Sequence, residues 1–113
     1  MYDTSNSQYL GHKCPLAQAG HDKEGRHGVR LISYGLLTDR ECRPVAIQVY
    51  PGNTGDPSTV PDQILKLRTG FDLHSVVLVG DRGMVTSAKI AQIRKARGLG
   101  WITALRTEGI RNL

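Results

Sequence analysis

The sequence predicts an α/β domain whose sheet is antiparallel in its early strands and parallel in its later ones. Residues 29–38 and 44–50 have the apolar and β-branched composition of strands and are separated by a short polar turn. The continuous apolar run at residues 75–80 is typical of a strand covered on both faces, as in parallel or mixed sheets. Residues 57–69 and 86–98 have helical spacing and flank this run, so helical crossovers can join the later strands.

The early part of the chain is expected to contain an opening strand, a loop and a hairpin. We expect the opening strand at residues 1–5. Residues 11–28 contain four glycines and three of the four histidines, which predicts an exposed loop. In the second strand of the hairpin, Val45, Ile47 and Val49 recur at period two and therefore share one face.

Two helices and a closing strand complete the expected order of elements. The first helix occupies residues 57–69, where apolar residues recur at helical spacing. The second helix is capped by Thr86 or Ser87 and ends at Gly98, a residue type that commonly stops helices. We expect the last strand at residues 101–105, which are mainly apolar and β-forming.

The composition is that of a single globular domain. The 113 residues are 39% hydrophobic and 22% charged, close to average values, which argues against wholesale disorder and fibrous structure. No apolar run approaches the roughly 20 residues that cross a bilayer, and Met1 is followed by polar residues rather than by a signal segment. We therefore expect a cytoplasmic protein without a membrane partner. Cys14 and Cys42 lie far apart in the sequence, and we expect both to be reduced.

Asp81 is an acid at the end of the apolar run, between Gly80 and the pair Arg82-Gly83. Ligands of open α/β sheets collect beyond the carboxyl ends of strands, and the glycines leave room for close approach. A carboxylate at this position can bind a divalent metal such as Mg²⁺, provided that a second acid lies nearby. It can also cap its own turn or pair with Arg82, and the local sequence leaves this choice open.

Asp3, in the opening strand, remains as the candidate for the second acid. Most of the other acids lie in the hairpin turn, at helix starts or in loops, where capping and exposure account for them. Asp22 and Glu24 are set aside because they belong to the predicted loop. Two ions about 4 Å apart, held by such carboxylates, can activate a water or hydroxyl and stabilise the leaving oxygen of a phosphodiester.

Seven short segments, spread over nearly the whole chain, carry a resemblance to a known family. They are YDTS at 2–5, CPLA at 14–17, YGLLTD at 34–39, RPVA at 43–46, PGNTGD at 51–56, VGDRGM at 79–84 and WITALR at 101–106. In this order the segments resemble insertion-sequence transposases of the DDE class. Within this class, the chain is similar to the branch whose catalytic core is interrupted by a long insertion.

The resemblance implies an incomplete ribonuclease-H-like core, with five strands and two helices in residues 1–113 and no second domain. Asp3, on the first strand, and Asp81, just after the fourth, correspond to the first two catalytic, metal-binding carboxylates of the family. The implied cofactor is Mg²⁺ or Mn²⁺, and the implied activity is DNA strand cleavage and transfer at insertion-sequence ends. The family's third acid, a Glu on a helix beyond the insertion, has no counterpart, since Glu108 lacks the helical context. We therefore expect a fragment of the enzyme that is inactive in isolation.

DNA, as insertion-sequence ends and target, is the partner that both the resemblance and the charge indicate. The 15 Lys and Arg exceed the 10 Asp and Glu, giving a net charge of +5 that suits a polyanion. The residues expected to contact DNA are Arg82, Lys89, Arg94, Lys95 and Arg97. A solvated helix face also accounts for the last four of these residues. A sheet edge left open in a fragment would permit self-association.

Three alternative interpretations remain open at this point. His12, Cys14, His21 and His27 can be arranged as a zinc site, but their spacing matches no standard finger and a polar loop also explains them. A receiver-like signalling domain also places an Asp at a strand end, but it needs an early acidic pair and a late Lys, where this chain has Arg106. A non-catalytic DNA-binding or assembly remnant needs only the basic surface and a stable core.

Overall fold

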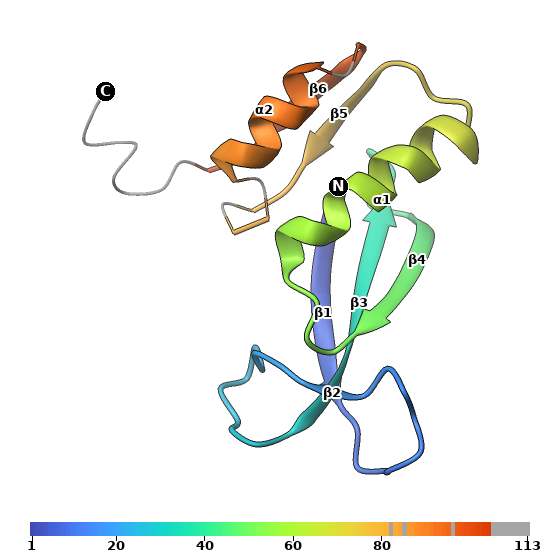
Figure 1. Ribbon diagram of the computed structural model, residues 1–113. Coiled ribbons are helices and arrows are strands. Elements are labelled where there is room, and N and C mark those ends of the chain that lie inside the picture. Colours follow the sequence, from blue (N-terminus) through green and yellow to red (C-terminus); the bar gives the residue numbers. More distant parts are fainter. Residues whose placement is uncertain (82, 85, 96, 105–113) are drawn as a thin grey trace. The chain divides into compact units, whose positions relative to one another are not determined.

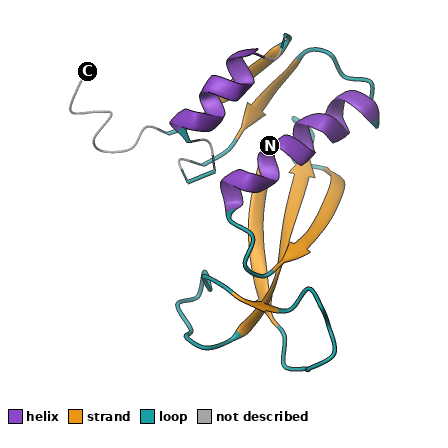
Figure 2. Cartoon of the chain, viewed as in Figure 1, coloured by secondary structure: helices purple, strands orange, loops and turns teal. Residues whose placement is uncertain are grey.

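The computed structural model describes residues 1–81, 83–84, 86–95 and 97–104, and these form two compact units (Figures 1 and 2). The first unit comprises Tyr2–Gly55, and the second begins at Asp56. In the described residues, no helix has the length and apolar character that a membrane span requires.

The first unit is an antiparallel sheet built around one central strand. Its strands are β1 (Tyr2–Gln8), β2 (Gln18–Ala19), β3 (Arg30–Thr38) and β4 (Pro44–Pro51). Strand β3 pairs with β1 along one edge and with β2 and β4 along the other, always antiparallel. The predicted hairpin of β3 and β4 is thus confirmed.

Two features of the first unit differ from the sequence-based expectation. The opening strand continues to Gln8, beyond the expected residues 1–5, because its polar second half pairs with β3 down to the pair Gln8↔Leu31. The expected loop at residues 11–28 contains the short strand β2, which pairs with the beginning of β3. In both places, backbone hydrogen bonding to β3 determines the structure, and side-chain composition gives no indication of it.

The pairing register assigns the side chains of this sheet to two faces. Leu31, Ser33 and Leu37 of β3 are buried on one face. Val45, Ile47 and Val49 share a face as predicted, and they are 43%, 62% and 45% exposed. The pairs Leu36↔Ile47 and Asp3↔Leu36 place Leu36 and Asp3 on this same exposed face.

The second unit combines two helices with a parallel strand pair. Its elements are α1 (Asp56–Thr69), β5 (Val76–Val79), α2 (Ser87–Lys95) and β6 (Leu99–Ile102). Strands β5 and β6 are parallel, in register from Val76↔Leu99 to Val79↔Ile102, and α2 connects them. The mixed α/β architecture, with early antiparallel strands, later parallel strands and two helices, is therefore confirmed.

The closing strand begins earlier than predicted. The expected range was residues 101–105, whereas β6 starts at Leu99, because the pairing with β5 begins there and includes Gly100. A glycine at a strand position weakens the sequence pattern, although the backbone pairs normally. The strand also ends earlier than predicted, at Ile102, because Thr103 and Ala104 lie outside it, and the expected last residue, Leu105, lies outside the described residues.

Gly98 lies between α2, which ends at Lys95, and β6, so the helix stops before the glycine at which the sequence predicted its end. Its φ of 78° lies in the left-handed region, which only glycine adopts at little cost. A Cβ at this position would collide with the carbonyl oxygen of His74. The Gly98 carbonyl accepts a 2.9 Å hydrogen bond from the Val76 N–H, so the same residue starts the parallel pair.

We predict that Gly98→Ala destabilises the protein by at least about 2 kcal/mol, because it combines backbone strain with a steric clash. The matched control is Gly100→Ala, since a Cβ at Gly100 would lie 3.4 Å from a methyl group of Val77, with no positive φ. Urea unfolding followed by circular dichroism compares the two variants. Equal stability of both variants would show that the close approach at Gly98 has no energetic role.

Candidate functional site

Asp3 lies near the start of β1, on the exposed face of the antiparallel sheet. Its Oδ1 atom accepts a 2.8 Å hydrogen bond from the N–H of Thr4. Within the described residues, the second oxygen, Oδ2, has no hydrogen-bond partner. One oxygen of the carboxylate is therefore held by a main-chain hydrogen bond, and the other takes no part in that contact.

The segment around Lys23 is bound to β1 directly beside Asp3. The Lys23 Nζ atom donates to the carbonyl of Thr4 and, at 2.9 Å, to its hydroxyl. The Asn6 side-chain amide donates at 2.9 Å to the carbonyl of His21. Both main-chain polar groups of Thr4 thus have side-chain partners, from Asp3 and Lys23. No periodicity or motif in the sequence indicates these contacts between a loop and a strand.

Asp22, which the sequence analysis set aside as a loop acid, is a buried structural residue. Its side chain is fully buried and forms a 2.7 Å ion pair with the Nε atom of Arg26. It also accepts hydrogen bonds from the main-chain N–H groups of Glu24 and Arg26. The hydrogen bond from the Arg26 side chain is the main reason why the pKa of Asp22 falls from 3.8 to about 2, while desolvation opposes this change. The Asp22 carboxylate therefore stabilises the conformation of this loop.

We predict that Asp22 contributes stability that acid removes. The folded-state pKa is lower than the unfolded one, so the contribution is present above pH 3.8 and is lost as the pH falls towards 2. Asp22→Asn should lower the urea midpoint at pH 7 and reduce the loss of stability between about pH 4 and 2. Asp39→Asn is a useful comparison, because the pKa of Asp39 is also lowered, by hydrogen bonds from Arg43. An unchanged pH profile in Asp22→Asn would contradict the assignment.

Asp81 follows β5 and caps the turn that comes after it. Its Oδ1 atom accepts a 2.8 Å hydrogen bond from the N–H of Met84, and its carbonyl accepts one of 2.9 Å from the hydroxyl of Thr103. The interpretation of Asp81 as a turn cap is therefore confirmed. The alternative pairing with Arg82 involves a residue outside the described part of the chain. Among the described residues, Asp81 Oδ2 has no hydrogen-bond partner, so capping occupies only one of the two oxygens.

The basic residues of α2 do not form one stripe. A residue advances about 100° around an α-helix, so Lys89, Arg94 and Lys95 point in directions roughly 100° to 140° apart. The Arg94 guanidinium lies 5.6 Å from the centre of the Trp101 ring, a cation–π contact. Arg97 follows the helix, and its side chain is exposed. The expected contact residue Arg82 lies outside the described residues.

The structure places the two candidate carboxylates in different units, Asp3 in the first and Asp81 in the second. Within the described ranges, no three His, Cys, Asp or Glu side chains are grouped so as to hold a metal ion. His12, Cys14, His21 and His27, the residues of the possible zinc site, all lie within these ranges.

No known protein-family model matches this chain, and no curated protein or solved structure matches it. The likeness to transposases therefore remains a prediction from the sequence.

Proposed function

We propose that this chain is part of the catalytic core of a DDE transposase with a ribonuclease-H-like fold. One observation carries the proposal: the order and direction of the strands, with an acid at each of two positions. Antiparallel strands come first and a parallel pair comes later, joined by α2. Asp3 lies on the first strand, and Asp81 directly follows the first strand of the parallel pair.

The two carboxylates share a local arrangement that suits metal binding. In each, Oδ1 accepts a 2.8 Å hydrogen bond from a nearby main-chain N–H, of Thr4 or of Met84. Such contacts orient a carboxylate and leave its other oxygen for a ligand. Bound divalent ions would supply activation of the attacking water or hydroxyl and stabilisation of the leaving oxygen at a DNA phosphodiester.

Under the proposal, Asp3 and Asp81 act together as metal ligands. Two carboxylates without the third acid are expected to hold one metal weakly.

With only two of the family's three acids, we expect no measurable cleavage of DNA. Catalysis by paired ions needs a further carboxylate to position the second ion, and a displacement of about 1 Å can cost around a hundredfold in rate. We therefore propose that this polypeptide binds metal and DNA without cleaving DNA at a measurable rate. Nicking of end-containing DNA in Mg²⁺ or Mn²⁺ that is lost in Asp81→Ala would contradict the proposed inactivity.

We predict that Mn²⁺ broadens the amide resonances of Thr4 and Met84 together in a nuclear magnetic resonance titration. Because one ion would be shared, Asp3→Asn or Asp81→Asn should weaken the broadening at both positions, by at least about tenfold in affinity. The control is Asp72→Asn, which removes an acid whose side chain is 91% exposed. Broadening that responds at only one of the two positions would show two independent sites and would contradict the shared site.

Non-catalytic DNA binding is a second candidate, favoured by the exposed cations at the end of α2. We predict that replacing Lys95 and Arg97 together by Gln weakens DNA binding and lowers the salt slope by about 2, since each phosphate contact contributes about 0.9. Fluorescence anisotropy at several salt concentrations measures this slope, with Lys13→Gln as a single-charge control outside α2. If DNA binding follows this pattern while Mn²⁺ binds at neither acid, the non-catalytic candidate is preferred.

A further inference from the structure

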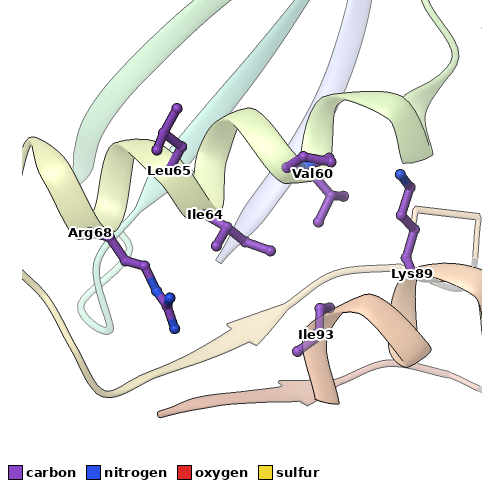
Figure 3. A pocket seen from close by; sticks show the side chains of 7 residues that line it. Val60, Ile64, Leu65, Arg68, Lys89 and Ile93 are labelled. Carbon is purple, nitrogen blue, oxygen red and sulfur yellow. The ribbon is translucent and has the colours of Figure 1, made fainter. Parts of the chain in front are cut away.

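The second unit contains an open pocket of about 400 Å³ lined by residues of α1 and α2. This volume lies within the range of small-molecule sites, roughly 300–1,000 Å³. Most of the lining is apolar, and two residues are cationic. The lining residues are Val60, Pro61, Ile64, Leu65, Arg68, Lys89 and Ile93. Figure 3 shows Arg68 extending from α1 and Lys89 extending from α2 into the space between the helices.

Arg68 has a hydrogen-bond donor that the described protein atoms leave unused. One of its terminal nitrogens, Nη2, donates to the main-chain carbonyl of Arg97 and so fixes the guanidinium. Its Nε atom is buried and has no hydrogen-bond partner among the described residues. A buried donor without an acceptor is costly, more so when it belongs to a charged group. A ligand oxygen beside Arg68 would remove this cost.

The charge of the pocket points to an anion. Arg68 and Lys89 supply two positive charges, and none of the lining residues is acidic. An arginine guanidinium pairs well with a planar carboxylate, because its N–H groups can form parallel hydrogen bonds to both oxygens. Val60 and Ile93 are already buried, whereas Ile64 is partly exposed, and the apolar body of a ligand in the pocket would cover Ile64.

We infer that this pocket binds a small amphipathic carboxylate. Its carboxylate accepts a hydrogen bond from Arg68, Lys89 contributes a second positive charge, and its apolar body packs against Ile64 and Ile93. This site involves neither Asp3 nor Asp81 and requires no DNA. It therefore extends beyond the proposed transposase function, and each can fail independently of the other.

The test titrates the protein with octanoate, 1-octanol and acetate while the methyl resonances of Ile64 and Ile93 are followed by nuclear magnetic resonance. We expect octanoate to shift both methyl groups and to bind at least about tenfold more tightly than either comparison compound, because acetate lacks the apolar body and 1-octanol lacks the charge. Arg68→Gln should lower the affinity for octanoate by about tenfold or more. Arg68→Lys should restore part of the affinity, and Lys13→Gln, a charge change in the first unit, should have no effect.

Several results would overturn the inference. Equal binding of 1-octanol would show a simple apolar cavity, and equal binding of acetate would show a surface anion contact. Octanoate that shifts neither methyl group would exclude the site. If Arg68→Gln disturbs the fold through its contact with Arg97, Lys89→Gln provides the second variant. Lys89→Gln should lower the affinity for octanoate severalfold and leave the affinity for 1-octanol unchanged. An unchanged affinity for octanoate in this variant would also contradict the inference.

Discussion

The backbone pairing of β3 is the constraint on which the first unit depends, because this strand is shared by all the other strands of its sheet. A shift of one residue in its register would move every side chain to the opposite face. Gly35 helps to fix the register, since a Cβ there would collide with the ring of the buried Tyr2. The position of Asp3 on the exposed face follows from the register, through its pairing with Leu36.

Periodicity predicted the elements whose own side chains are patterned, and it failed where a neighbouring strand determines the structure. The hairpin, α1 and β5 were located closely, because each has apolar residues at the spacing of its own secondary structure. The polar end of β1 and the short strand β2 have no such pattern, and they exist because β3 provides hydrogen-bond partners. Likewise, β6 begins at Leu99 because β5 pairs with it there.

The candidate site was predictable to the extent that it depends on chain position. Asp81 was identified because an acid follows an apolar strand, and the structure adds that its Oδ1 atom caps the next turn. A cap and a metal ligand are compatible roles for one carboxylate, since the cap uses a single oxygen. The burial of Asp22 and the contact of Lys23 with β1 were not predictable, because contacts between a loop and a strand produce no periodic pattern in the sequence.

The cations near α2 show why net charge is a poor guide to a binding face. Arg94 covers Trp101, Lys89 lines the apolar pocket, and Lys95 points in a third direction. Three positive charges within seven residues of helix therefore face three different surroundings. A phosphate backbone that lies along one side of α2 can reach only some of them, so the number of DNA contacts is smaller than the number of cations. The charge of +5 accordingly favours association with an anion of some kind, and the directions of individual side chains decide which anion each one meets.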